Sequence, residues 1–300
     1  MSNPVFYALV VIVWSTTPLA IHYSNDSLSA IAAVNVRMLI AFFIVAGISC
    51  IIGFNHFRFA QNWRLYLASS IGIFPNMPLV YASANYISSG LISVLFALSP
   101  FITAFLAQRF LLEKTLGKRQ IVCLLIALVG LVIVTQGHIQ ISSDAWKGIV
   151  LMLLSCFCFS INSIAIKYYA AQLRQPVSPP QQLTGSLMFS LPGLLITWLV
   201  IDKHNILNLS FSETSLYATL YLALVGSVIG FMAYYFLLRS ISAVAVSLIP
   251  LITPAFSLIL GKYFNAEVLN NSIIMGTSII IAALALFNDD IAKRIKKLIN

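Results

Sequence analysis

The sequence predicts an all-α polytopic membrane protein with ten transmembrane helices, arranged as two inverted five-helix repeats. Three observations lead to this prediction. Of the 300 residues, 60% are hydrophobic and only 8% are charged, with a mean hydropathy of +0.96, whereas soluble domains carry about 25% charged residues. The apolar residues gather in ten runs, each close to the roughly 20 residues that a helix needs to cross a bilayer. The second half of the chain also repeats the first.

Turn-forming or charged residues bound each of the ten apolar runs. Because the hydrocarbon layer holds no water, each span must satisfy its backbone hydrogen bonds internally. Long continuous runs do this as helices, whereas the strands of membrane barrels are shorter and alternate polar with apolar residues. The predicted helices cover residues 4–22, 29–53, 64–87, 89–112, 119–136, 147–170, 183–201, 215–238, 242–263 and 271–288.

The distribution of positive charge predicts the orientation of these helices. The net charge is +9, from 17 Lys and Arg against 8 Asp and Glu, and basic residues are retained on the cytoplasmic side of membrane proteins. With both termini inside, 13 basic residues fall on cytoplasmic segments, three fall outside (Lys147, Lys203 and Lys262), and Arg37 is left in a span. The charge is therefore a topology signal, and we expect no nucleic-acid partner.

An internal repeat relates the two halves of the chain. At a shift of 154 residues, Gly72, Tyr81, Pro100 and Glu113 fall in order on their counterparts in the second half, Gly226, Tyr235, Pro254 and Glu267. Nearer the start of each half, a shift of 145 residues places Phe159 over Trp14 and Asn162 over Thr17.

Each half therefore holds five helices, and an odd number inverts the second copy in the membrane. The predicted units are a first repeat over 1–140, a second over 141–288 and a tail over 289–300. Inverted repeats of this kind are typical of secondary transporters, whose substrate site lies near the bilayer midplane.

Three segments, together with the two repeats, resemble the EamA-type branch of the drug/metabolite transporter superfamily. They are Trp14-Ser-Thr-Thr-Pro in the first helix, Arg37-Met-Leu-Ile-Ala in the second, and Ser99-Pro followed after twelve residues by Glu113 in the fourth. The resemblance covers residues 4–288. It implies that helices one, three, four, six, eight and nine surround a central cavity. It also implies export of amino acids and other metabolites, or uptake of a vitamin such as riboflavin.

Arg37 is the most informative single residue. It lies about nine residues into the second predicted helix, where a charge costs at least about 2.5–3.5 kcal/mol and usually faces a partner or a wet cavity. It is a candidate counter-charge for a substrate carboxylate or phosphate, or a partner for a backbone carbonyl at a gate. The alternative is that it reaches the outer surface, about 13 Å away at 1.5 Å per residue, or braces helix ends.

Aromatic and amide side chains gather on the helices expected to form the cavity. Such groups bind a flat or amphipathic solute by stacking and by neutral hydrogen bonds. The alternative is that they serve helix packing and interfacial belts. The candidate substrate-binding residues, besides Arg37, are Trp14, Thr17, Asn76, Tyr81, Asn85, Asn162, Tyr234 and Tyr235.

Prolines and two glutamates are candidate hinges or gates. Pro75 and Pro78 are expected to kink the third helix beside Asn76, because proline removes an intrahelical hydrogen bond; the kink serves either the cavity or packing. Pro100 and Pro254 are expected to bend helices four and nine, as hinges or as fixed shape. Glu113 and Glu267 either gate opposite sides or cap the next helix. Gly72 and Gly226 are expected to allow close helix approach.

The acidic residues are informative by their positions. All eight map to loops, tails or helix ends, so no span holds the central carboxylate that a proton relay normally uses. Facilitated diffusion, exchange, or coupling without a buried acid is expected instead. The sequence contains no nucleotide-binding or hydrolase motif, and its four cysteines lie in apolar runs. We therefore expect no enzyme activity, no cofactor and no metal. A membrane enzyme or a sensor is the alternative from another class.

The tail, 289–300, combines apolar residues on one face with Lys and Arg on the other. This pattern suits a helix on the inner leaflet, bound to anionic lipid. The expected function is a secondary transporter that exports a small, amino-acid-like metabolite by alternating access. The expected location is the bacterial inner membrane, with both termini cytoplasmic. The alternative within this class is riboflavin uptake.

Overall fold

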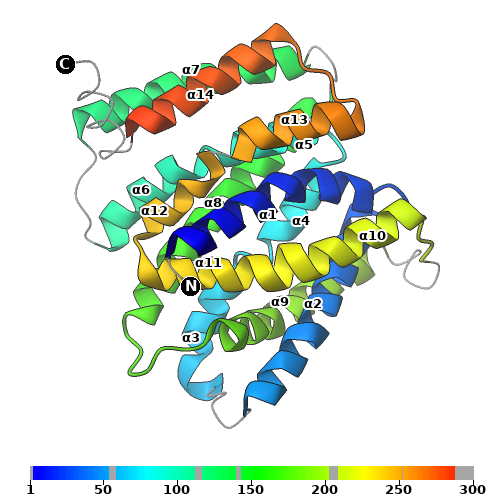
Figure 1. Cartoon of the computed structure of the whole chain (residues 1–300), viewed down its shortest axis with the longest axis vertical. Coiled ribbons are helices and arrows are strands. Elements are labelled where there is room, and N and C mark those ends of the chain that lie inside the picture. The colour runs from blue at the N-terminus through cyan, green and yellow to red at the C-terminus, as the bar shows by residue number, and fades with distance from the viewer. Residues whose placement is uncertain are drawn as a thin grey trace.

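The computed structural model describes residues 3–53, 59–111, 117–139, 143–202, 209–251 and 253–287, and every regular element in these residues is helical (Figure 1). In chain order the helices are α1 (Asn3–Ser24), α2 (Ala30–Gly53), α3 (Phe59–Ser70), α4 (Asn76–Ser83), α5 (Ser89–Phe96), α6 (Ser99–Phe110), α7 (Lys118–Ile139), α8 (Ala145–Ala170), α9 (Pro179–Ile201), α10 (Glu213–Tyr221), the π-helix η2 (Leu222–Ile229), α11 (Gly230–Ser240), α12 (Ala243–Ser247), the 3-10 turn η3 (Ile249–Leu251), α13 (Thr253–Asn265) and α14 (Asn271–Phe287).

Six helical stretches in the described residues are long and apolar enough to cross a membrane. They are α1, α2, α5 with α6, α8, α9, and α10 through α11. The other four predicted segments coincide with α3 and α4, with α7, with α12 through α13, and with α14. The chain is therefore an all-helical, multi-pass membrane protein.

The inside and outside of the molecule suit a lipid environment. Large apolar side chains such as Phe43 and Ile51 are 69% and 88% exposed, whereas polar side chains such as Asn35 and Gln182 are fully buried. In lipid, apolar side chains cover the outer surface at no cost, and polar groups must find partners inside the bundle.

Serines begin several of the helices. The hydroxyls of Ser88, Ser212 and Ser242 accept hydrogen bonds from backbone N–H groups in the first turns of α5, α10 and α12, which satisfies donors that a helix start leaves open. At the start of α9, the side-chain oxygen of Gln181 accepts from the backbone N–H of Ser178 over 3.3 Å, and two prolines follow Ser178. For this reason α9 begins four residues before the predicted start at 183.

The third predicted helix is broken rather than kinked. Residues 71–75 separate α3 from α4, the peptide bond before Pro75 is cis, and Pro78 lies in the first turn of α4. Neither proline has an N–H to continue the ladder from α3. The prediction of one kinked helix over 64–87 is wrong in this respect.

The fourth and ninth predicted helices are also interrupted. Pro100 is the second residue of α6, and Pro254 is the second residue of α13. Proline fits the first turn of a helix because its missing N–H has no intrahelical partner there. The two repeat-related prolines therefore begin the second piece of each segment instead of bending a continuous helix.

The helices pack around a central group. Helix α1 packs on α5, α10, α11 and α13, while α8 packs on α3, α4, α5 and α6, and α2 packs on α9. Helices α7 and α14 lie side by side along one edge of the molecule (Figure 1). A Cβ built on Gly130 would lie 2.8 Å from the carbonyl oxygen of Gly276, so the two backbones approach directly, as small residues permit in membrane helices.

We expect Gly130→Leu to destabilise the protein by about 1–3 kcal/mol, the usual cost of inserting atoms into a packed contact. The matched control is Gly47→Leu, because a Cβ at Gly47 would meet no atom within 4 Å. Thermal unfolding of both variants in detergent measures the difference. Equal melting temperatures for the two variants would contradict a direct contact between α7 and α14.

Candidate functional site

A cavity of about 80 Å³ lies among helices from both halves of the chain. Its walls come from α1, α2, α4, α5, α8, η2, α11 and α13. The lining residues are Trp14, Thr17, Pro18, Ile21, Arg37, Gly72, Asn76, Met77, Val80, Ile92, Ser93, Phe96, Met152, Phe159, Asn162, Gly226, Phe231, Tyr234 and Thr253.

Arg37 projects into the protein and lines this cavity. The side chain is 2% exposed, so it does not extend to the outer surface. Its Nε donates to the hydroxyl of Ser227 over 2.8 Å, and its Nη1 donates to the hydroxyl of Tyr81 over 3.3 Å. Its Cζ lies 5.8 Å from the centre of the Tyr81 ring, within the range of a cation–π contact. Arg37 thus joins α2 to α4 and to η2.

The π-helix η2 brings two residues to the guanidinium. Ser227 supplies the hydroxyl, and a Cβ at Gly226 would lie 3.0 Å from Nη2 of Arg37. Single π-turns often occur at functional sites. Gly226 was expected to be a point of close approach, whereas Ser227, which directly follows it, was not among the predicted residues.

Asn162 satisfies backbone groups that the break in the third segment leaves open. Its Nδ2 donates to the carbonyl oxygens of Ala68 and Ser69 over 2.8 and 3.1 Å, and its Oδ1 accepts from the hydroxyl of Tyr234 over 3.1 Å. A Cβ at Gly72 would lie 2.8 Å from this Oδ1. Gly72, like Gly226, therefore leaves room for a polar side chain rather than for a second helix backbone.

Both polar atoms of the Asn76 side-chain amide form hydrogen bonds. Its Nδ2 donates to the carbonyl oxygen of Gly72 over 3.2 Å, and its Oδ1 accepts from the hydroxyl of Ser155 over 2.6 Å. The amide is 1% exposed. Asn76 therefore fixes the start of α4 against α8, and it forms part of the cavity wall.

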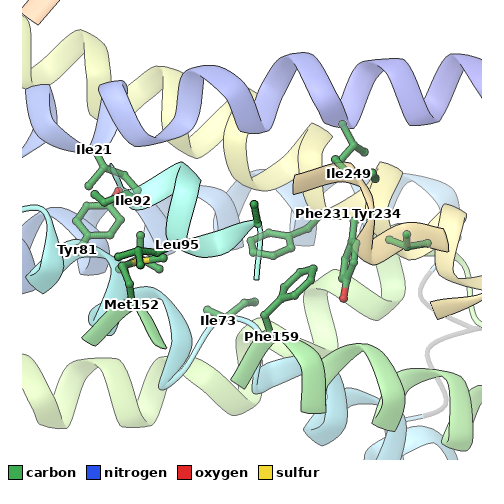
Figure 2. Close-up of a cluster of buried hydrophobic side chains, with 14 of the residues drawn as sticks. Ile21, Ile73, Tyr81, Ile92, Leu95, Met152, Phe159, Phe231, Tyr234 and Ile249 are labelled. Atoms are coloured by element: carbon green, nitrogen blue, oxygen red, sulfur yellow. The ribbon is translucent and has the colours of Figure 1, made fainter. Parts of the chain in front are cut away.

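An aromatic cluster, made of Trp14, Phe96, Phe159 and Tyr234, forms part of the cavity wall. The ring centres of Phe96 and Phe159 are 4.8 Å apart, and those of Trp14 and Phe159 are 5.6 Å apart. Trp14 and Tyr234 lie 5.5 Å apart. Phe159, Phe231 and Tyr234 lie together in Figure 2, away from Tyr81, Ile92 and Met152. The repeat partner of Trp14, Phe159, therefore packs against it.

Three predicted binding residues do not line the cavity. Tyr81 lies against Arg37, and Tyr235 donates to Ser186 over 3.3 Å. Both tyrosines are buried. Asn85 is exposed and accepts from the side chain of Asn25 over 3.5 Å. The structure thus brings Trp14, Thr17, Arg37, Asn76, Asn162 and Tyr234 together, and the equivalence of Tyr81 and Tyr235 does not extend to facing the cavity.

Glu267 binds the start of α5. Its Oε1 accepts from the backbone N–H and hydroxyl of Ser89 over 2.9 and 2.5 Å, and its Oε2 accepts from the N–H of Gly90 over 3.2 Å. A carboxylate at a helix N-terminus is stabilised by the open N–H groups and the helix dipole. Glu267 therefore caps α5, a helix of the first half, rather than α14, the next helix in the chain. Its repeat partner, Glu113, lies outside the described residues, as does the tail from 289 to 300.

The other described acids lie at helix ends or in turns. Asp26 follows α1, Asp144 precedes α8, Asp202 follows α9, and Glu213 begins α10. Within the described ranges, no group of three or more His, Cys, Asp or Glu side chains is placed to hold a metal ion.

The sequence profile of the EamA-like transporter family matches residues 3–136 and again residues 146–288. An uncharacterized inner membrane transporter of Escherichia coli, YedA, is 23% identical over 94% of this chain and 90% of its own length. The protein PecM of Dickeya dadantii is 25% identical over 81% of this chain and 80% of its own length. One crystal structure superposes with a TM-score of 0.71 at 14% identity, covering 96% of this chain and 98% of the other.

We expect Glu267→Gln to lower stability by about 1–2 kcal/mol, since a charge-assisted cap is replaced by a neutral amide with one donor facing the N–H of Gly90. The control is Glu213→Gln at an exposed helix start whose cap, Ser212, remains. Melting temperatures in detergent compare the two. An unchanged melting temperature with altered transport would instead identify Glu267 as a gate.

Proposed function

The chain belongs to the EamA-like transporter family, and from this we propose that it is a secondary transporter that moves a small metabolite by alternating access around the central cavity. The observation that carries the proposal is the position of Arg37. A cation buried in a membrane protein is costly and usually marks a substrate pathway. Here it lines a cavity bounded by both halves, and its two hydrogen-bond partners are hydroxyl groups.

We also propose ten transmembrane helices in two inverted repeats, over residues 1–140 and 141–288. The helix pairing supports this arrangement. A pseudo-twofold axis exchanges α1 with α8, α3 and α4 with α10 and α11, and α5 and α6 with α12 and α13. Accordingly, α8 packs on α3, α4 and α6 while α1 packs on α10, α11 and α13, and α2 and α7 pack on their own counterparts, α9 and α14. The two matches to the family profile fit the same division.

Alternating access needs segments that change shape at the cavity. In inverted-repeat transporters, interrupted helices commonly build the midplane site, and one half rocks against the other. The break between α3 and α4, the junctions before Pro100 and Pro254, and the π-helix η2 are interruptions of this kind. Pro75, Pro78, Pro100 and Pro254 are proposed to stiffen the pieces on either side.

We propose the bacterial inner membrane as the location, with both termini cytoplasmic. The excess of Lys and Arg on the segments assigned to the inside supports this orientation, and YedA is an inner membrane transporter. The basic tail is proposed to lie on anionic lipid. Membership of a transporter family and the peripheral positions of the described acids speak against an enzyme.

For the solute, we propose export of an amino-acid-like or related metabolite, with riboflavin uptake as the alternative. Arg37 favours a solute with a negative or strongly accepting group. The aromatic cluster and the acid-free lining suit a neutral ring system such as a flavin. Flux of labelled riboflavin and of labelled amino acids into proteoliposomes separates the two. Absence of flux for both would remove both assignments.

We expect Trp14→Ala to raise the half-saturation concentration of the transported solute about fivefold or more, because the aromatic cluster loses its largest ring. Tyr235→Phe is the control, since Tyr235 is buried away from the cavity. Initial rates in proteoliposomes, normalised to the amount of inserted protein, measure both. An equal effect of the two changes would reassign Trp14 to packing.

A further inference from the structure

We infer that the cavity recognises a compact organic anion: a single carboxylate on a short apolar body, without an ammonium group. This inference rests on the proposed transport function and narrows the solute to one chemical class. It excludes free amino acids and flavins as the best ligands of the site, and it retains amino-acid-related compounds that lack the amino group, such as short 2-oxo acids.

The guanidinium of Arg37 has donors to spare. It carries five N–H groups, and in the part of the chain that the structure describes it donates two hydrogen bonds, from Nε and from Nη1. Nη2 lies beside Gly226, a glycine of the cavity wall, at the position where any larger residue would intrude. Arg37 and Gly226 both line the cavity, so the unused N–H groups of the guanidinium lie at the cavity wall.

Within the described residues, the hydrogen-bond partners of the Arg37 guanidinium carry no negative charge. Its two partners, Ser227 and Tyr81, are hydroxyl groups, and the described acids lie at helix ends or in turns. A cation in an apolar interior is stabilised mainly by an anion with matching hydrogen bonds. A planar carboxylate fits the arginine fork with two parallel hydrogen bonds. The missing anion is therefore supplied by the solute.

Among the described lining residues, the cavity offers an ammonium ion no carboxylate; the acceptors there are neutral, namely the hydroxyls of Thr17, Ser93 and Thr253 and the amide oxygens of Asn76 and Asn162. Its lining includes no Asp, Glu or His. Each of the two amide oxygens already accepts one hydrogen bond, Oδ1 of Asn76 from Ser155 and Oδ1 of Asn162 from Tyr234. A zwitterion would therefore bury its positive charge against neutral acceptors only.

The aromatic cluster does not replace the missing acid. Aromatic cages hold cations in a space between ring faces. Here the rings pack against one another, with centres 4.8 Å apart for Phe96 and Phe159 and 5.6 Å apart for Phe159 and Tyr234. Such contacts leave no room for an ammonium group between the rings, but they offer an apolar wall to a hydrocarbon body.

The size of the cavity limits the ligand. The cavity volume is about 80 Å³, below the roughly 300–1,000 Å³ of pockets that hold drug-sized ligands. Short branched or unbranched carboxylates suit a cavity of this size. A flavin ring system is several times larger and would require a different, expanded cavity.

The test compares three ligands that share a carbon skeleton, by calorimetric titration of the purified full-length protein at pH 7. They are 3-methyl-2-oxobutanoate, an anion of eight non-hydrogen atoms; valine, a zwitterion; and 3-methyl-2-oxobutanamide, which is neutral. We expect the anion to bind at least about tenfold more tightly than either of the others. Equal or tighter binding of valine or of the amide would overturn the inference.

Three variants test whether the anion binds at Arg37. Arg37→Gln is expected to weaken binding of the anion at least tenfold and to leave the weak binding of the amide unchanged, whereas Arg37→Lys retains part of the affinity. Arg109→Gln removes the same charge at an exposed position near the end of α6. This variant is expected to bind the anion and the amide as the unaltered protein does. Unchanged binding of the anion by Arg37→Gln would overturn the inference. If Arg37→Gln fails to fold, the comparison of the three ligands on the unaltered protein still tests the inferred preference for an anion.

Failure of this inference differs from failure of the proposed function. Flux of riboflavin or valine in proteoliposomes, together with no preference for the anion, would leave a transporter with a different ligand class. Tight, Arg37-dependent binding of the anion without flux of the anion would support the site and contradict transport.

Discussion

The interior of this protein is organised around one buried cation. Arg37 is 2% exposed, and a guanidinium in an apolar bundle must be surrounded by hydrogen-bond acceptors. Tyr81 on α4 and Ser227 in η2 supply two of them. Three segments distant in sequence must therefore meet at one point. The break before α4, the π-turn and the two glycines of the cavity wall are the local features that allow this meeting.

The same requirement extends to the backbone. An interruption of a helix inside a membrane protein leaves carbonyl groups without a helical hydrogen-bond partner, and water cannot replace that partner. The amide of Asn162 covers the carbonyls of Ala68 and Ser69, and the hydroxyl of Ser190 donates to the carbonyl of Ser70 over 3.3 Å. Polar residues from the second half thus complete the broken segment of the first half. These hydrogen bonds to backbone carbonyls explain why amides and serines are buried in a chain with so little charge.

Composition and the apolar runs predicted the helical class and most segment boundaries, because hydrophobicity acts over whole segments. The resemblance of three short segments, together with the two repeats, predicted the family. The repeat identified equivalent positions such as Tyr81 and Tyr235, but equivalence does not determine which side of a helix faces the cavity. Ser227 escaped prediction because a π-turn adds a residue and rotates the helical faces that follow. The prolines predicted kinks and bends, whereas the structure has breaks. Whether proline bends or breaks a helix depends on the side chains available to satisfy the freed carbonyls.

The contacts of Glu267 have a mechanical consequence. This residue follows α13 in the second half of the chain, and it holds Ser89 and Gly90 at the start of α5 in the first half through three hydrogen bonds to one carboxylate. Each such bond to a charged group is worth about 1.5–3 kcal/mol when water does not replace it. Any motion that parts α5 from α13 at this end must break or rehydrate all three together. The cap of α5 therefore depends on the second half of the chain staying beside the first half at this end.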